Sequence, residues 1–355
     1  MSTRGPITAA AMVAIAVLAG VPAQADDVPG VPSAPPPAID PAMTRTGLLS
    51  IESTGPQRDH LKIASAAMRR VIEVDVLRGT GAAPRPTLYL LDGVDGETTS
   101  GWLSKGGAAE FFADKPVDVV LTSGGTGSMY SDWVRHDTAL GLNRWETFLT
   151  EELPPIVESL LKADGRRAIA GVSMGAQAAM MLAQRHPGRY RAVAGMSGCY
   201  STADPLGHAV TTITVASRGG NVENLWGPPT SPEWAAHDSL LGAPALRGTA
   251  IYLSAATGTP TGADLVSIAQ SPSIVDALRL AGGGAALEAG ARTCTERFAG
   301  RLHELKIPAV VEYAPEGMHT WPDFEAQLPR AWRVLAEALA LPSPKWRGIT
   351  ARRAR

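Results

Sequence analysis

The pentapeptide GVSMG at residues 171–175 constrains the fold of this chain more than any other feature. Ser173 stands between Gly171 and Gly175, after the apolar run 168–172 and before a helix-forming stretch rich in alanine and methionine. A serine on a sharp strand-to-helix turn has a strained backbone and leaves no room for side chains two residues away. The pattern therefore predicts a nucleophilic serine at the end of a strand, with an ordinary glycine-rich turn as the alternative.

Short apolar runs alternate with helical stretches along the rest of the chain. The strand-like runs are 71–77, 87–91, 117–122, 168–172, 192–197, 250–255 and 309–313, and the helical stretches are 145–163, 174–184, 294–305 and 324–341. Several of the strands are apolar on successive residues, as buried parallel strands require. Alternating strands and helices predict an α/β fold, with a mostly parallel central sheet covered by helices on both faces. Ser173 would then lie at the carboxyl end of a central strand, where such sheets place their sites.

The N-terminus has the pattern of an export signal. An apolar run at 7–20 is followed by Ala23-Gln24-Ala25, a small-x-small cleavage pattern. We read residues 1–25 as a signal peptide and expect a protein that is secreted or held at the cell envelope. An uncleaved N-terminal anchor is the alternative.

The remaining chain divides by composition into three parts. Residues 26–43 are rich in proline and suit an extended linker, and residues 44–341 form the expected α/β domain. Residues 342–355 carry several arginines and lysines and read as a basic tail. Adhesion of this tail to an anionic envelope surface is the minority interpretation.

Charge and ligand patterns exclude some classes of function. The formal net charge is −2, which gives no reason to expect a nucleic-acid partner. The histidines lack metal-ligand spacing, so we expect neither a metal site nor a cofactor.

A catalytic serine needs a base, normally a histidine held by a carboxylate, and in this fold the order is serine, acid, histidine. His319 follows the last predicted strand on a glycine-containing loop, EYAPEGMHTW, which is the expected place for that histidine. The acid should follow the strand at 250–255, which leaves Asp264, Asp276 and Glu288 as candidates. Topology alone favours Asp264, the closest to the strand.

Seven collinear segments together resemble a known family. They are YLLDG (89–93), YSDW (130–133), RWETFLTEELP (144–154), GVSMG (171–175), LWGPPTSPEW (225–234), LEAGARTCTERF (287–298) and GMHTW (317–321). The chain resembles the secreted cell-wall mycolyltransferases of the mycobacterial major-antigen group, within the wider esterase family of α/β-hydrolases. The resemblance covers roughly residues 50–340. It implies an acyl group carried on serine, a Glu/His pair behind it, a lipid ester donor, and a sugar or glycolipid acceptor.

The resemblance also assigns roles to residues of the site. The family acid is a glutamate followed four residues later by arginine, which selects Glu288 over Asp264. The family pattern LLDG places one oxyanion-hole amide at Val94, and the residue after the nucleophile, Met174, supplies the other.

Substrate contacts are expected at Asp92, which matches a sugar-contacting aspartate of the family, and at Trp321. A carboxylate that merely orders its loop is the alternative for Asp92. Trp226, Trp234 and Trp321 are candidates to line a groove, although core packing is expected for at least two of them. The sequence departs from the family at Asp95, where the relatives carry arginine, and this change bears on the sugar site.

Cys199 and Cys294 permit one intramolecular disulfide in an exported protein. The expected fold brings both to one edge of the active site, so we predict that they are paired. Two separate buried thiols are the alternative.

The sequence thus predicts a secreted serine acyltransferase with Ser173, His319 and Glu288 as its triad. A carboxylesterase that uses water as acceptor is the nearest rival. A non-catalytic envelope protein that keeps the fold for binding is a third reading, and the presence of all three triad residues weighs against it.

Overall fold

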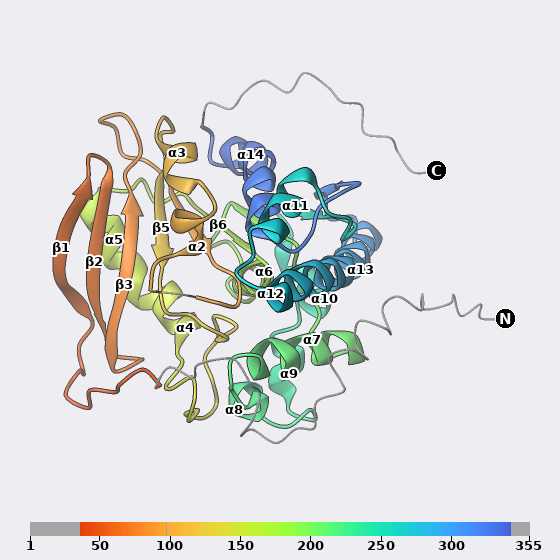
Figure 1. Ribbon diagram of the computed structural model, residues 1–355. Helices are drawn as coiled ribbons and strands as arrows, with labels where there is room; N and C mark the ends of the chain where they lie inside the picture. The colour runs from red at the N-terminus through yellow and green to blue at the C-terminus, as the bar shows by residue number, and fades with distance from the viewer. Residues whose placement is uncertain (1–35, 97, 342–355) are drawn as a thin grey trace.

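The computed structural model describes residues 36–96 and 98–341, which form a nine-stranded sheet with helices around it (Figure 1). In spatial order the strands run β1-β2-β3-β5-β4-β6-β7-β8-β9. Their bounds are β1 (Gly47–Gly55), β2 (Arg58–Ser65), β3 (Arg70–Leu77), β4 (Thr87–Leu91), β5 (Asp118–Thr122), β6 (Arg167–Val172), β7 (Ala192–Met196), β8 (Ala250–Ala255) and β9 (Val310–Tyr313).

The sheet is parallel from β5 to β9 and antiparallel from β1 to β5. The predicted α/β fold with a mostly parallel sheet is confirmed. Two antiparallel strands, β1 and β2, were not foreseen. Nearly all of β1 is exposed along this edge of the sheet, so its sequence carries no buried face to recognise.

Helices connect the strands and cover both faces of the sheet (Figure 1). Their bounds are α2 (Gly101–Ser104), α3 (Ala108–Phe112), α4 (Trp145–Thr147), α5 (Leu153–Leu161), α6 (Met174–Arg185), α7 (Pro205–Ala216), α8 (Val222–Trp226), α9 (Pro232–Ala236), α10 (Ser239–Gly242), α11 (Gly262–Ala269), α12 (Ile274–Leu278), α13 (Gly284–Glu304) and α14 (Trp321–Ala338). Short π-helical segments join α4 to α5 and α12 to α13.

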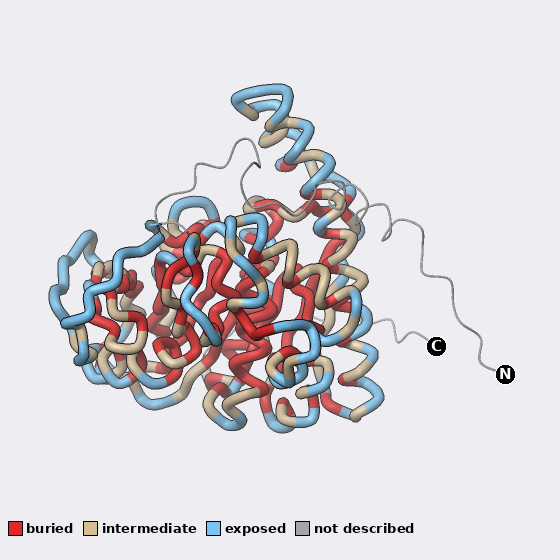
Figure 2. Tube along the Cα trace, turned by 90° about the horizontal axis from the view of Figure 1, so that it is seen from below, coloured by how far each residue is buried: buried red, intermediate tan, exposed pale blue. Residues whose placement is uncertain are grey.

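Two apolar clusters fill the spaces between the sheet and its helices. Successive strand residues point to opposite faces, so Ile169 joins the cluster under α5, α6 and α13, whereas Ala168 and Ala170 join the one under α2, α3 and α14. Buried residues accordingly concentrate along the middle of the molecule (Figure 2). A sheet buried on both faces holds its strand ends rigidly, and the candidate site stands on those ends.

Helix α13 begins ten positions before the predicted start at residue 294. Glu288 therefore lies within a helix, not on the loop expected after β8. Three glycines at 282–284 lead into the helix, and because glycine has a low helix propensity, the sequence does not predict a helix start there.

The ends of the chain are only partly described. The predicted signal peptide (1–25), most of the linker (26–43) and the basic tail (342–355) lie outside the described residues. The described end of the linker rests on the domain, because the Asp40 N–H donates to the Arg69 carbonyl at 2.7 Å. In the described part of the chain, no helix combines the length and apolar character needed to cross a bilayer.

Candidate active site

Ser173 occupies a sharp turn between β6 and α6, with φ 55° and ψ −121°. A Cβ added to Gly171 would lie 2.3 Å from the Gly175 carbonyl oxygen, and one added to Gly175 would lie 2.3 Å from the Asp92 carbonyl oxygen. These neighbours are backbone atoms that cannot move aside. The two glycines are therefore required by space, and the turn presents Ser173 above the carboxyl end of the sheet.

His319 reaches Ser173 from the loop between β9 and α14. Its Nε2 lies 2.7 Å from Ser173 Oγ, and its Nδ1 lies 2.9 Å from Glu288 Oε2. Because the carboxylate can only accept a hydrogen bond, we assign the hydrogen to Nδ1, which leaves the Nε2 lone pair facing the serine hydroxyl. The ring also packs edge-on against Phe324 at a centroid distance of 5.1 Å.

Glu288 is 0% exposed and accepts hydrogen bonds on both of its oxygens. Oε1 accepts from Ser197 Oγ at 2.8 Å and from the Ala256 N–H at 2.7 Å, and Oε2 faces His319. The side chain belongs to α13, whereas Ser197 follows β7 and Ala256 follows β8. This carboxylate therefore connects α13 to the carboxyl ends of β7 and β8.

Asp264, the candidate favoured by topology, is also 0% exposed but has other partners. Its carboxylate caps the first turn of α11 with Thr261 and accepts from Thr320 Oγ1 at 2.6 Å. The structure therefore brings Glu288, and not Asp264, to the imidazole of His319.

The two expected oxyanion donors belong to segments that meet at the serine. Met174 is the first residue of α6, so its N–H has no carbonyl partner within the helix. Val94 follows Gly93, where an added Cβ would lie 3.5 Å from Ser173 Cβ. The loop after β4 therefore passes directly beside the nucleophile.

Asp92 and Trp321, expected to contact substrate, order the polypeptide around the site. Asp92 is 3% exposed, and its Oδ1 accepts from Ser100 Oγ at 2.9 Å and from the Trp102 N–H at 3.3 Å. Trp321 is partly buried and packs edge-on against Trp102 at a centroid distance of 5.5 Å. Asp92 thus ties the end of β4 to α2, and Trp321 packs α14 against α2.

The charge at Asp95 is balanced from another part of the chain. Arg218, just beyond α7, donates from Nη2 to Asp95 Oδ1. A guanidinium group thus stands beside the position at which the resembled family carries arginine. Sequence reasoning missed Arg218 because more than 120 residues separate it from Asp95.

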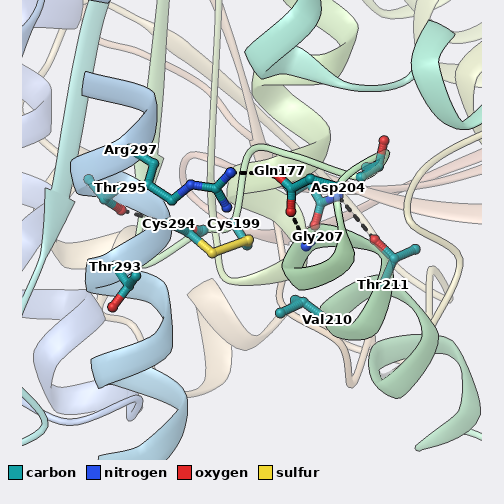
Figure 3. The surroundings of a disulfide bond; sticks show 12 residues. Gln177, Cys199, Asp204, Gly207, Val210, Thr211, Thr293, Cys294, Thr295 and Arg297 are labelled. Carbon is teal, nitrogen blue, oxygen red and sulfur yellow. Dashed lines mark hydrogen bonds and ion pairs between the residues drawn. A yellow bond between two sulfur atoms is a disulfide. The ribbon is translucent and has the colours of Figure 1, made fainter. Parts of the chain in front are cut away.

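The predicted disulfide is confirmed, since Cys199 and Cys294 are bonded with their Cα atoms 4.8 Å apart. It links the segment after β7 to α13, two turns beyond Glu288. Figure 3 shows the ion pair between Arg297 and Asp204 beside it, with an Nη2–Oδ2 distance of 2.6 Å. Two cross-links therefore hold the helix that carries Glu288.

The remaining tryptophan candidates are core residues. Trp226 and Trp234 are fully buried, and their rings meet edge-on at a centroid distance of 5.3 Å. Each also stacks on a histidine, Trp226 on His237 and Trp234 on His208. The expectation that at least two of the three tryptophans pack in the core holds for this pair.

The sheet, the serine turn and the Ser–His–Glu array define the α/β-hydrolase class of serine esterases and acyltransferases. The chain belongs to the Esterase family, described as "Putative esterase", which it matches over residues 65–335.

Similar proteins include mycobacterial acyltransferases. "Diacylglycerol acyltransferase/mycolyltransferase Ag85A" of Mycobacterium leprae is 34% identical over 214 residues, which is 57% of this chain and 63% of that protein. Its namesake in Mycobacterium tuberculosis is 33% identical, covering 57% and 62%. The chain thus matches less than two thirds of the length of these relatives. The resemblance to the mycolyltransferase group is nevertheless confirmed.

Solved structures support the fold. MPT51 (FbpC1) of Mycobacterium tuberculosis superposes with a TM-score of 0.62 at 23% identity, covering 82% of this chain and 99% of that chain. An S-formylglutathione hydrolase from Agrobacterium tumefaciens has a TM-score of 0.59 at 16% identity, with the same coverage. At these identities the likeness concerns architecture alone.

Proposed function

We propose that this chain is a secreted serine acyltransferase that moves a long acyl group, such as a mycolyl group, from a lipid ester to trehalose or a cell-wall glycan. The observation that carries the proposal is the continuous array from Ser173 Oγ through His319 to Glu288, with successive distances of 2.7 and 2.9 Å. A serine hydroxyl becomes a nucleophile when such a base removes its proton.

The reaction proceeds in two halves. As Ser173 Oγ attacks the ester carbonyl carbon, its proton passes to His319 Nε2, and Glu288 stabilises the resulting imidazolium. The N–H groups of Val94 and Met174 donate to the oxyanion of the tetrahedral intermediate. The intermediate collapses to acyl-Ser173, and the leaving alcohol takes the proton from His319.

An acceptor hydroxyl then reverses these steps. It gives its proton to His319 as its oxygen attacks the acyl carbon, and the Ser173–acyl bond breaks while Oγ recovers the proton. These atoms balance without a metal or a redox cofactor. A sugar hydroxyl yields an acylated sugar, whereas water yields free acid.

Exposed apolar side chains near the site support a lipid donor. Leu265, Val266, Ile274, Val275, Leu278 and Leu287 are between 50% and 74% exposed. We call these six residues the apolar patch. It lies on α11, α12 and the first turn of α13, and Leu287 adjoins Glu288. Exposed apolar patches mark surfaces that meet lipid or other apolar partners.

A sugar acceptor is what the resemblance to the mycolyltransferase group implies, and Arg218 supports it. The guanidinium beside Asp95 restores a donor of hydrogen bonds near the loop after β4. The rival, a carboxylesterase with the same triad, differs only in what deacylates Ser173.

The test is to incubate the mature protein with a lipid ester and a panel of sugars, then to quantify acylated sugar against free acid by mass spectrometry. We expect acylated sugar together with free acid. Free acid alone, at a rate that no sugar alters, would leave the esterase. Ser173→Ala should abolish both products and also labelling by a fluorophosphonate.

A further inference from the structure

A pair of buried carboxyl groups lies next to the loop that carries His319. Asp264 belongs to α11 and Asp323 to the first turn of α14, so the pair joins two elements that flank this loop. Neither side chain belongs to the triad. Burying two neighbouring acids costs free energy, so the pair is expected to have a role.

The pair holds the residues on both sides of His319. The Met318 N–H donates to Asp323 Oδ2, and Thr320 Oγ1 donates to Asp264 Oδ1 at 2.6 Å. Thr320 Oγ1 also lies 3.3 Å from Asp323 Oδ2. His319 is therefore flanked by two residues that the acid pair anchors.

Other contacts limit the loop without replacing this anchor. The His319 N–H donates to the Gly284 carbonyl at 3.1 Å, and the Gly317 N–H donates to Thr259 at 2.7 Å. Gly317 has φ 136°, and a Cβ there would lie 2.7 Å from Ala256 Cβ and 3.3 Å from Asp323. The loop thus fits against Asp323 closely, and a change in this side chain reaches His319 through two peptide units.

The pKa values of the two carboxyl groups are shifted in opposite directions. Burial raises the pKa of Asp323 to about 6, and the neighbouring Asp264 adds to the increase. Burial alone would raise the pKa of Asp264, but hydrogen bonds from Thr320 and Thr261 outweigh it and lower that pKa. Besides each other, the two carboxyl groups face the hydroxyls of Thr261 and Thr320 and the backbone N–H groups of Thr261 and Met318. One proton between two carboxyl groups satisfies both, whereas two negative charges repel.

Building on the proposed function, we propose that Asp264 and Asp323 are positioning residues: by anchoring Thr320 and Met318, they hold His319 Nε2 against Ser173. Loss of the anchor leaves the substrate surface intact and displaces only the base. It should therefore lower kcat and leave KM nearly unchanged.

The test compares Asp323→Asn with Asp323→Ala, and uses Asp276→Ala as the matched control. Asn copies the protonated acid, since its amide oxygen accepts from Met318 and its N–H donates to Asp264. Asp276 is an acid of α12 bonded to Ser273 and Arg279, away from the His319 loop. We would measure kcat and KM for a p-nitrophenyl ester, and the rate of fluorophosphonate labelling, from pH 5 to 9.

We expect Asp323→Ala to lower kcat by about 10- to 100-fold, with Asp323→Asn within about threefold of wild type at pH 5.5. The ratio of the Asn variant to wild type should rise as pH increases through about 6, because only wild type then gains the second charge. Asp276→Ala should match wild type.

Three results would overturn the proposal: equal losses in the Asn and Ala variants, a kcat for the Ala variant within about twofold of wild type, or a ratio that stays flat with pH. If Asp323→Ala does not fold, Thr320→Val supplies the same test, because it removes the hydroxyl that Asp264 binds. An unchanged kcat in Thr320→Val would also refute the anchor. Labelling of wild type at Ser173 tests the proposed function separately: its absence would remove that function, whereas normal labelling with an unaffected Ala variant would remove only the anchor.

Discussion

Three donors surround the carboxylate of Glu288, and this explains how a single side chain can fix the base of the reaction. Ser197 and Ala256 occupy Oε1, so the carboxylate cannot rotate away from His319. The imidazole in turn presents one defined nitrogen to Ser173. Orientation at this scale is set by hydrogen bonds from groups that do not themselves react.

Glu288→Gln tests this orientation. The amide N–H₂ cannot accept the Nδ1 proton, so the ring loses its preferred tautomer. We expect kcat for ester hydrolysis to fall by about 10³- to 10⁴-fold, with the fold retained because the new side chain has the same shape. Steady-state kinetics alongside circular dichroism would check this. Retention of more than about a tenth of the activity would mean that another group orients His319.

Gly175→Ala tests the space around the serine turn. The new Cβ would lie 2.3 Å from the Asp92 carbonyl oxygen, so the loop after β4 must shift. We expect a loss of about 1 to 3 kcal/mol of unfolding free energy and a loss of activity. The control is Gly300→Ala on the exposed face of α13, where the added Cβ meets no atom within 4 Å. That change should stabilise the helix by about 1 kcal/mol, as urea titration would show.

At the scale of elements, α13 is the component that the site depends on most. Glu288 lies in its N-terminal part, Phe298 and Leu302 in its C-terminal part are buried in the core, and Cys294 lies between Glu288 and Phe298. Its partner Cys199 follows β7, the strand next to β6, which leads into the Ser173 turn. The disulfide therefore fixes the distance between the acid and the sheet edge.

Removing the disulfide with Cys199→Ala and Cys294→Ala should destabilise the domain. A closed loop with a sequence separation of 95 is worth up to about 4 to 5 kcal/mol on the chain-entropy model. We expect a lower thermal midpoint in calorimetry, with activity retained at low temperature. An unchanged midpoint would show that core packing alone fixes α13.

Polar substitution of the apolar patch should separate long from short substrates. We expect Ile274→Ser with Leu278→Ser to raise KM for long-chain esters and to leave turnover of a p-nitrophenyl acetate unchanged, because only long chains reach the patch. Leu241→Ser on α10 is the control: Leu241 is 54% exposed, and the next residue, Gly242, lies against Gln184 near the C-terminal end of α6, whereas Ser173 precedes the N-terminal end of that helix. Equal effects on both substrates would argue against lipid contact.

At the scale of the whole molecule, a polar cluster ties distant parts of the chain together away from the active site. Glu146 of α4 accepts from Arg185 and His186 at the end of α6, both at 2.8 Å, and faces His237 beyond α9. Burial would raise the pKa of Glu146, but these partners outweigh it and hold the pKa below its ordinary 4.5. His186 is the residue that ends α6, so the cluster also holds the end of this helix.

Glu146→Gln should therefore destabilise the protein in a pH-dependent way. A carboxyl with a depressed pKa stabilises the fold above its unfolded-state value, and this contribution is lost as pH falls below about 4.5. We expect a loss on the order of 2 to 3 kcal/mol at pH 7 that shrinks in acid. Urea unfolding at several pH values would measure it, with the exposed Glu337→Gln as control. A difference that grows in acid would contradict the assignment.

The amino-acid sequence determined those features whose physical cause is local. The serine turn is predictable from Gly171, Ser173 and Gly175, because its steric requirements lie within five consecutive residues. The central strands were recognisable because burial on both faces leaves unbroken apolar runs. The exposed edge strand β1 and the early start of α13 escaped, since neither follows from a local pattern.

Tertiary structure decided the contacts between residues far apart in the chain. Asp264 and Glu288 both follow β8, and spacing from the strand favoured Asp264; both side chains are 0% exposed, so burial does not separate them either. Family resemblance favoured Glu288, and the packing of α13 against the ends of β7 and β8 brings that side chain to His319. The same packing joins Asp264 to Asp323 and Arg218 to Asp95. Such pairings depend on where whole elements settle against a common core, and no stretch of sequence carries that information by itself.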